Sequence, residues 1–311
     1  MARVSQDTDV NVIWAPNRGS QRSFMACPIF EVLLEGTRGG GKSDVLLMDF
    51  AQFVGQGFGR AWRGILFRQT YPALEEVVER CYRWFPQIFP GAKYNGAKHC
   101  WRFPTGEALY LRYAEREKDY YKYHGHEYPW IGWEELTNWP DEGLYTSMMS
   151  VCRSSYPGMP RHYRSTCNLY GVGHNWVKAR FIDPAPRGQI IEDEQGRQRV
   201  AIHSSLAECP QLCANDPDYI KNLKALTGPK REAWLLGRER WNGHRPGGWH
   251  PTADAQRGPL PHRGTVRLDG QAERGHAGAG GDGGTTHPGD RAAGQVGRAR
   301  RAGGLRHLRA G

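Results

Sequence analysis

The sequence predicts an α/β fold in which helices flank a mainly parallel β-sheet, and two observations indicate it. Apolar runs of strand length alternate with helical patterns from residue 29 to residue 237, which is the order that βαβ units produce. The first apolar run, residues 29–34, enters a Gly-x-x-x-x-Gly-Lys-Ser motif at residues 36–43, and a second apolar run follows at once. A strand, a glycine-rich loop and a helix in this order predict a P-loop NTPase.

The motif at residues 36–43 has the residues needed to hold a triphosphate. Its glycines let consecutive backbone N–H groups surround phosphate oxygens, and the following helix directs its positive N-terminus at the same anion. Lys42 is expected to reach the β- and γ-phosphates, and the Ser43 hydroxyl to bind Mg²⁺. The predicted nucleotide-binding residues of this loop are Gly36, Thr37, Arg38, Gly39, Gly40, Gly41, Lys42 and Ser43.

Residues 1–28 are expected to form an irregular lead-in to the first strand. Gln21 lies shortly before that strand. Its side-chain amide offers one donor and one acceptor to an adenine edge, and an ordinary exposed glutamine is the alternative.

The elements after the P-loop helix alternate as the fold class requires. They are strands at 64–67, 128–133 and 163–167, helices at 73–85, 144–151, 174–182, 218–226 and 230–236, and hairpins within 101–113 and 189–203. Residues 115–123, which are charged and rich in tyrosine, are expected to form a mobile loop.

The pattern stops at residue 237. Residues 238–311 contain 18 glycines and no Ile, Phe, Tyr, Met or Cys. Such a segment buries too little apolar surface to offset its chain entropy, so it is expected to be a disordered Arg/Gly/Pro-rich tail. The abrupt change in composition is also what a change of reading frame in GC-rich DNA produces, and the coding sequence across codon 237 tests that hypothesis.

Charge and hydropathy restrict the class of protein. The net charge is +10, but the 13 arginines and 6 acidic residues of segment 238–311 supply +7 of it. The folded part is therefore only weakly basic, and its charge alone does not indicate nucleic-acid binding. The first residues lack the pattern of a secretion signal, and no apolar run is long enough to span a membrane. A soluble, unexported protein is expected.

Glu134 and Glu135 follow the apolar strand at 128–133 and are the candidates for hydrolytic chemistry. Hydrolysis needs one carboxylate at Mg²⁺ and another that positions the attacking water. Successive side chains of a strand point to opposite sides, so Glu134 is assigned to Mg²⁺ and Glu135 to the water. A solvated acidic pair opening a helix is the alternative.

Other polar residues are candidates for sensing the γ-phosphate or stabilising its charge. Thr166 and Asn168 close the strand at 163–167, where a hydroxyl and an amide can report loss of the γ-phosphate to neighbouring elements; simple capping of the strand end is the alternative. Arg38, inside the P-loop, is a candidate for the charge that stabilises the transferred phosphoryl group. The alternatives for that role are Arg153, Arg161 and Arg164, including as a finger that reaches a neighbouring subunit.

Four segments together resemble the ATPase domain of the large terminase subunit of tailed bacteriophages, a DNA-packaging motor. They are Gln21 with the loop 36–43, Phe-Arg-Gln-Thr-Tyr-Pro-Ala-Leu-Glu-Glu at 67–76, residues 125–136 around Glu134 and Glu135, and residues 166–178. The resemblance implies a RecA-like (ASCE) core, with Gln21 reading adenine, Glu135 as catalytic glutamate, Lys42 and Arg38 on the phosphates, and Thr166 and Asn168 as the coupling motif.

The resemblance also implies partners and a place of action. It implies ATP and Mg²⁺ as cofactors, double-stranded DNA as the translocated partner, a portal protein, a small terminase subunit, and a homo-oligomeric ring on the capsid in the cytoplasm of a bacterial host, without a membrane. The family continues into a nuclease domain with an acidic metal site, whereas residues 238–311 contain no strand-borne acidic cluster, so nuclease activity is not expected. The alternatives are a truncated remnant that only binds nucleotide, and a helicase-like or repair P-loop ATPase.

Overall fold

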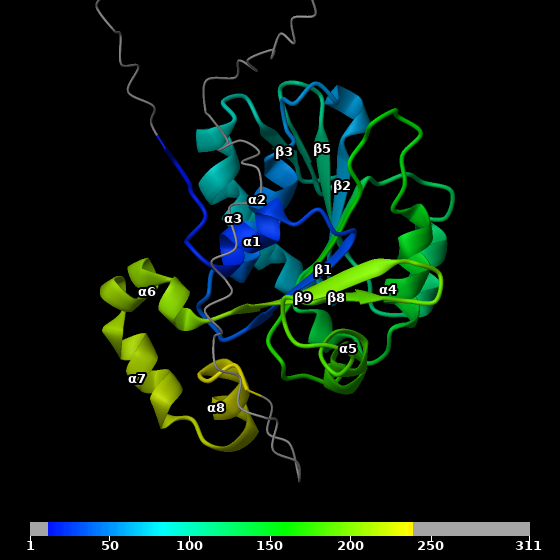
Figure 1. Cartoon of the computed structure of the whole chain (residues 1–311). Coiled ribbons are helices and arrows are strands. Elements are labelled where there is room, and N and C mark those ends of the chain that lie inside the picture. The colour runs from blue at the N-terminus through cyan, green and yellow to red at the C-terminus, as the bar shows by residue number, and fades with distance from the viewer. Residues whose placement is uncertain (1–11, 239–311) are drawn as a thin grey trace, which may run out of the picture. The chain divides into compact units, whose positions relative to one another are not determined.

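A nine-stranded sheet forms the centre of the computed structural model, which describes residues 12–238. Its order is β3-β4-β5-β2-β6-β7-β1-β9-β8 (Figure 1). The six strands from β5 to β9 in this order pair in parallel, whereas β3-β4-β5 and β8-β9 pair antiparallel at the edges. The strands are β1 (Glu31–Gly36), β2 (Arg63–Arg68), β3 (Lys93–Asn95), β4 (Cys100–Arg102), β5 (Ala108–Tyr113), β6 (Trp130–Trp133), β7 (His162–Cys167), β8 (Ile190–Glu192) and β9 (Gln198–Ser204). The predicted fold class and both predicted hairpins are confirmed.

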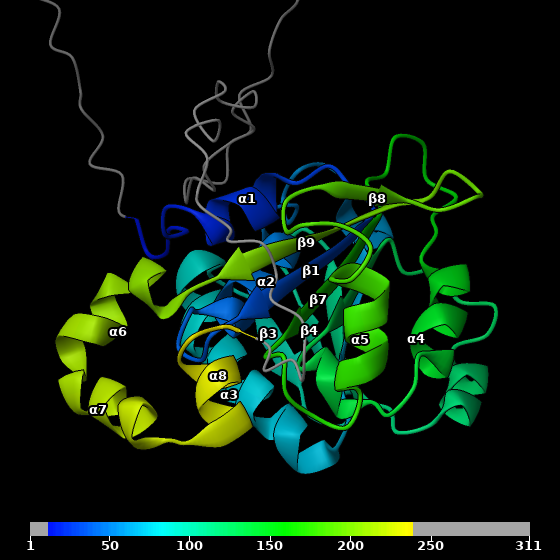
Figure 2. The same cartoon turned by 60° about the horizontal axis from the view of Figure 1, so that its bottom comes forward.

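Helices cover both faces of this sheet (Figures 1 and 2). The first three lie on one face, α4 and α5 lie on the other, and the last three form a group beside the end of β9. The helices are α1 (Ser20–Ala26), α2 (Lys42–Ala51), α3 (Tyr71–Ile88), α4 (Gly143–Met148), α5 (His174–Phe181), α6 (Pro210–Asn215), α7 (Pro217–Ala225) and α8 (Gly228–Trp234). None of the described helices is long and apolar enough to cross a membrane.

Two apolar clusters hold the helices on the sheet, one on each face. In β1, Val32 and Leu34 belong to the cluster under α2 and α3, and Leu33 to the cluster under α4 and α5. In β2, Leu66 and Ile65 divide in the same way. Central parallel strands are buried on both faces, which explains why they read as continuous apolar runs in the sequence.

A buried ion cluster joins the P-loop helix α2 to β7. Arg164 and Asp49 lie 3.3 Å apart, and both side chains are fully buried. The Asp49 carboxylate also accepts hydrogen bonds from His162 (3.0 Å) and from the indole of Trp130 (2.8 Å). The rest of the Arg164 guanidinium donates to backbone carbonyls ahead of β1, including that of Ile29. The cluster therefore fixes α2, β6, β7 and the entry to β1 relative to one another.

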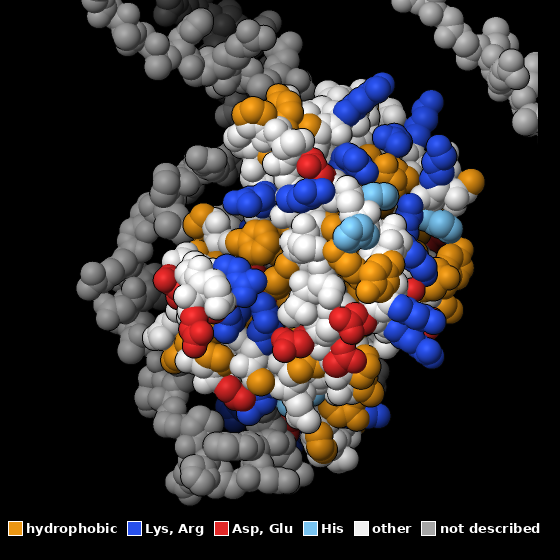
Figure 3. Space-filling model, turned by 90° about the vertical axis from the view of Figure 1, so that its right-hand side faces the viewer, with side chains coloured by type: hydrophobic (Ala, Val, Ile, Leu, Met, Phe, Trp, Pro, Cys, Tyr) orange, Lys and Arg blue, Asp and Glu red, His pale blue; other side chains and the backbone are white. Residues whose placement is uncertain are grey.

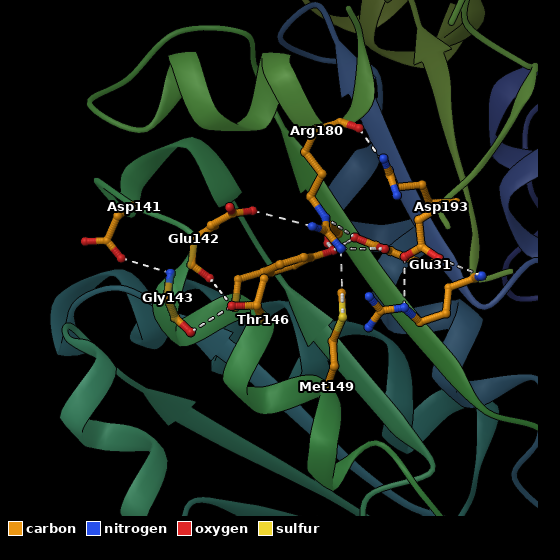
Figure 4. Close-up of polar contacts among 12 residues, drawn as sticks. Glu31, Asp141, Glu142, Gly143, Thr146, Met149, Arg180 and Asp193 are labelled. Carbon is orange, nitrogen blue, oxygen red and sulfur yellow. Dashed lines mark hydrogen bonds and ion pairs between the residues drawn. The ribbon is translucent and has the colours of Figure 1, made fainter. Parts of the chain in front are cut away.

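A second cluster of polar contacts joins the start of β1 to α4 and α5 on the other face of the sheet (Figure 4). Arg180 of α5 donates to both carboxylate oxygens of Glu31, at 2.7 and 3.0 Å, and one of its nitrogens reaches Glu142 next to α4 at 3.4 Å. Tyr145 donates to Glu31 as well, at 3.0 Å. A carboxylate that is nearly buried is stable only with such partners, and here they hold α4 and α5 on the sheet.

The structure differs from the sequence prediction in four places. Residues 20–26 of the lead-in form helix α1, whose Phe24 is fully buried, instead of an irregular segment. The predicted mobile loop at 115–123 contains the 3-10 helix η2 (Glu117–Lys122) and packs through the buried Tyr123. Helix α6 and strand β3 are further elements. Residues 1–11 of the lead-in and 239–311 of the predicted tail lie outside the described residues.

Substitution of Asp49 tests the ion cluster. Asp49→Asn leaves the Arg164 charge buried without its counter-charge, so the free energy of unfolding should fall by roughly 3–5 kcal/mol, as measured by chemical denaturation. The matched control is Asp218→Asn, which removes one charge from an exposed ion pair with Lys221 and should change stability little. Equal effects of the two substitutions would contradict the structural role of the cluster.

The same cluster predicts a pH dependence of stability. Burial, with the charge of Arg164 added, lowers the pKa of His162 below its usual 6.5, although Asp49 opposes the shift. The folded state thus disfavours imidazolium, and the unfolded chain binds the proton first as pH falls below about 6.5. The melting temperature should therefore decline from about pH 6.5 to 5, and His162→Gln should reduce that slope. An unchanged slope in the variant would contradict the assignment.

Candidate functional site

The P-loop joins the C-terminal end of β1 to the start of α2. Gly36, Gly39 and Gly41 have φ values of 141°, 81° and 70°, a region that side chains with a Cβ rarely adopt. A Cβ on Gly36 would lie 1.9 Å from the backbone oxygen of Ser204. Glycine is therefore required here both by the backbone conformation and by the proximity of β9.

Lys42 is held at the centre of the loop. Its side chain is buried, and its Nζ donates to the carbonyl oxygen of Thr37 at 2.6 Å and to Oδ1 of Asn168 at 3.0 Å. Burial lowers the pKa of Lys42, and the nearby carboxylate of Glu135 is the strongest of the charges that oppose this shift. The amine therefore lies in the enclosed position that a phosphate-binding lysine needs.

Asn168 bridges Lys42 and Glu135. While its Oδ1 accepts from Lys42, its Nδ2 lies 3.2 Å from each carboxylate oxygen of Glu135. Three residues predicted separately, from the P-loop, the acidic pair and the end of β7, thus form one hydrogen-bonded chain. Thr166, two residues before Asn168, is buried in β7 beside Leu34 of β1 and makes none of these bonds.

Glu135 occupies its position through an unusual backbone turn. Strand β6 ends at Trp133, and Glu135 adopts φ 57° and ψ 57° at the start of the 3-10 helix η3 (Leu136–Asn138). From the sequence, the two carboxylates are expected to point apart because side chains alternate along a strand. In the structure they are separated by this left-handed turn instead. Such a conformation is costly for a residue with a side chain and recurs at functional sites.

Glu134 is adjacent to Ser43, and together they provide oxygen ligands suited to Mg²⁺. Glu134 is only 5% exposed, which excludes the alternative that Glu134 and Glu135 are a solvated acidic pair. Its carboxylate lies 3.7 Å from the guanidinium of Arg68. Burial raises the pKa of Glu134, against the charge of Arg68 and a hydrogen bond with Ser43. Mg²⁺ in triphosphate sites takes few protein ligands and completes its shell with phosphates and water. These two residues fit that requirement.

Arg38 points to helix α8 in this structure. Its backbone N–H donates to the carbonyl of Trp234 at 2.9 Å, and its guanidinium lies 3.4 Å from the centre of the Trp234 ring. The ring also contacts Tyr170 edge-on. Sequence analysis missed Trp234, because no local pattern distinguishes this aromatic residue from a packing residue of the last helix.

The alternative arginines lie elsewhere. Arg164 is fully buried in the ion cluster with Asp49, so it cannot reach the phosphate of a neighbouring subunit. Arg161 precedes β7 and Arg153 donates to carbonyls of residues 125 and 126, at the ends of β6 and β7 opposite to Asn168.

Gln21 contacts the backbone of the P-loop. It is buried in α1, its Nε2 donates to the carbonyl oxygen of Gly40 at 3.0 Å, and its Oε1 accepts from the backbone of Asn17 at 2.8 Å. It is therefore not an ordinary exposed glutamine. Both ends of its amide are used within the protein, so contact with adenine would require these bonds to be exchanged.

Comparison with solved structures places the fold among large-terminase ATPase domains. The large terminase of a thermophilic bacteriophage superposes with a TM-score of 0.56 at 15% identity, over 72% of this chain and 53% of that chain. The ADP complex of that terminase gives 0.54 at 14% identity, over 71% and 53%. The ATPase domain of the Thermus phage P74-26 large terminase gives 0.50 at 15% identity, over 73% of this chain and 95% of that domain.

The likeness has a limited extent. The chain spans about half the length of the first of these proteins, the full large terminase of the thermophilic bacteriophage. No family model and no curated protein matches the sequence. The likeness therefore shows the fold: the described chain has the P-loop NTPase fold of large-terminase ATPase domains, as the resemblance in the sequence implied.

Proposed function

We propose that this chain is the ATP-hydrolysing motor subunit of a viral terminase and translocates double-stranded DNA into a procapsid. The observation that carries the proposal is the chain of hydrogen bonds from Lys42 through Asn168 to Glu135, next to the Ser43–Glu134 pair. It connects a phosphate-binding lysine to a carboxylate that can position water, within a fold shared with terminase ATPase domains.

Each residue has a distinct part in the hydrolysis. Backbone N–H groups of the loop and the N-terminus of α2 bind the phosphates of ATP, and Lys42 stabilises the charge that develops on the γ-phosphate. Glu135 accepts a hydrogen bond from the attacking water and aligns it with the phosphorus. Ser43 and Glu134 would hold Mg²⁺, which neutralises charge on the β- and γ-phosphates when bound.

Asn168 is placed to report the state of the nucleotide. Its amide touches both the lysine that binds the γ-phosphate and the carboxylate that positions the water. Loss of the γ-phosphate would change the hydrogen bonds that Lys42 makes, and with them the position of Asn168 at the end of β7. This supports the coupling role of the segment around Thr166 and Asn168.

The partners in the proposal follow from the resemblance. A portal protein, a small terminase subunit and further copies of this chain in a ring would complete the motor, in the cytoplasm of a bacterial host. An arginine supplied in cis by Arg38, or by a neighbouring copy, would stabilise the transferred phosphoryl group.

Lys42→Ala tests phosphate binding. Removal of the amine deletes a charge that acts mainly on the transition state, so kcat/KM for ATP should fall at least about 100-fold, measured as phosphate release by the full chain. Lys224→Ala, which removes an exposed lysine of α7, is the control. Turnover equal to that of the control would contradict the site.

Glu135→Gln separates binding from chemistry. The amide keeps the size of the side chain but cannot polarise water as the carboxylate does, so kcat should fall about 10²- to 10⁴-fold while labelled ATP still binds. Glu194→Gln is the matched control, because Glu194 is exposed in the turn between β8 and β9, at the end of β9 opposite to the P-loop. Normal turnover by Glu135→Gln would refute the assigned role.

Trp234→Ala tests whether the stacked Arg38 is held away from the nucleotide. Stacking must be given up before the guanidinium reaches a phosphate, so its loss should lower the KM for ATP about three- to tenfold. Trp234→Phe keeps an aromatic face and should behave more like the parent. A KM that is unchanged by the alanine substitution, or changed equally by both, would contradict this interpretation.

A further inference from the structure

A pocket of about 390 Å³ lies beside the last residues of β5, and none of its lining residues belongs to the P-loop. Strand β4 pairs with residues 108–110 of β5, and the Leu111 N–H donates to the carbonyl of His99 at 2.9 Å, so only the last two residues of β5 lack a paired strand on that side. The pocket forms around this free part of the strand. Its walls include Arg63, Tyr110, Arg112, Lys122, His126 and Tyr128.

The pocket is basic and aromatic. Five tyrosines, two arginines, one lysine and two histidines are among its lining residues, and none of them is acidic. The neighbouring pocket, by contrast, is lined by Glu75 and Glu79 of α3. The positive character therefore belongs to this pocket and not to the whole sheet edge.

Its two arginines have no carboxylate partner. Among the described residues no ion pair is formed by Arg63 or Arg112, although both are partly buried. Lys122 differs, because it pairs with Asp119 at 2.7 Å. The carboxylate of Glu127 accepts hydrogen bonds from Ser155 and interacts with Arg63 only through its charge, without an ion pair in contact. Partly buried cations normally have a counter-charge, and in this pocket an anionic ligand would provide it.

The arginines are held ready for such a ligand. Both guanidinium groups lie over Tyr110, at 5.8 Å for Arg63 and 5.3 Å for Arg112. The hydrogen bonds of Arg112 to described residues all leave from Nη1, toward three backbone carbonyls, so that Nε and Nη2 remain available. An arginine fixed in this way can donate two parallel bonds to a phosphate with little loss of entropy.

The positive surface continues beyond the pocket. Lys93, Lys98 and Arg102 are exposed on the adjoining β3–β4 hairpin. Burial raises the pKa of the Cys100 thiol, and the charges of Arg102, Arg112, Arg63 and Lys98 act against that shift. A single small anion would use only the pocket, whereas a polyanion can use the pocket and the hairpin together.

One face of the molecule shows the corresponding distribution of side chains. Figure 3 views the side on which α4 lies in Figure 1, and η2, which carries Lys122, packs on α4. Lys, Arg and His side chains, with hydrophobic and aromatic ones between them, gather in the upper half of that view, and most acidic side chains lie lower. On this face, therefore, the basic side chains are concentrated in the part where acidic side chains are few.

We propose that this pocket binds a backbone phosphate of DNA through Arg63 and Arg112, with the β3–β4 hairpin contacting the neighbouring phosphates. The choice of double-stranded DNA as the polyanion rests on the proposed function. The tyrosines provide flat surfaces for the sugar and for the arginines, and the contact is independent of base sequence because only the backbone is bound.

The test is the salt dependence of DNA binding by the full chain. A fluorescent duplex is titrated without nucleotide, so that the result does not depend on ATP hydrolysis, and binding is measured over a range of salt concentrations. Arg63→Gln/Arg112→Gln should weaken binding about tenfold or more and lower the slope of log K against log salt by about two. The Arg-rich segment 238–311 is present in every variant and contributes equally.

Two comparisons make the result decisive. Arg83→Gln/Arg197→Gln removes the same charge from exposed positions outside the pocket and should leave the slope nearly unchanged. Arg63→Lys/Arg112→Lys keeps the charge and should retain most of the slope. Equal slopes for the pocket and control variants would overturn the proposal, as would equal losses in the Gln and Lys variants, which would indicate packing alone.

Two further measurements test whether the variants fold and whether the pocket binds the phosphate of DNA or that of a nucleotide. Circular dichroism confirms folding, and each single Gln variant, expected to lower the slope by about one, replaces the double variant if that variant does not fold. Labelled ATP is titrated into Lys42→Ala with and without the pocket substitutions. If these substitutions abolish ATP binding there and leave DNA affinity intact, the pocket is a nucleotide site and the proposal is wrong.

Discussion

The buried pair of Asp49 and Arg164 is the interaction on which the site geometry depends. Asp49 belongs to the helix that starts at the P-loop, and Arg164 to the strand that ends near Asn168. Fixing these two elements together sets the distance between Lys42 and Asn168 at their other ends. Because both charges are removed from water, each is stable only with the other in place, and this makes the relative position of helix and strand well defined.

Much of the fold follows from sequence periodicity, whereas the details of the site do not. The buried strands of the sheet were predictable because their residues are apolar in succession, as Val32, Leu33 and Leu34 are. The Gly-rich loop was predictable because each of its residue types has a known function in holding phosphate. Helix α1 was not predictable, because it has only seven residues and no side-chain N-cap. It is stabilised by packing of its buried Phe24 against the core. Tertiary packing overrides weak local preference in such short elements.

The contacts that define the site join residues far apart in the chain. The stacking of Arg38 on Trp234 and the support of Gly40 by Gln21 depend on where α8 and α1 pack, which local sequence does not specify. The left-handed backbone of Glu135 runs against residue preference. Sequence reasoning could identify Lys42, Glu134, Glu135 and Asn168 as chemically suitable, but the hydrogen bonds that join Lys42, Asn168 and Glu135 required the structure.

Hydrolysis at this site is proposed to move DNA, and packaging in a reconstituted mixture measures that movement directly. The mixture combines the full chain with portal-bearing procapsids, the small subunit, ATP and linear duplex DNA, and the DNA that becomes protected from added nuclease is scored. We predict protection that depends on ATP and on the wild-type chain and is lost when Glu135 is replaced by Gln. ATP turnover with no protected DNA in the complete mixture would contradict the coupling of hydrolysis to DNA movement.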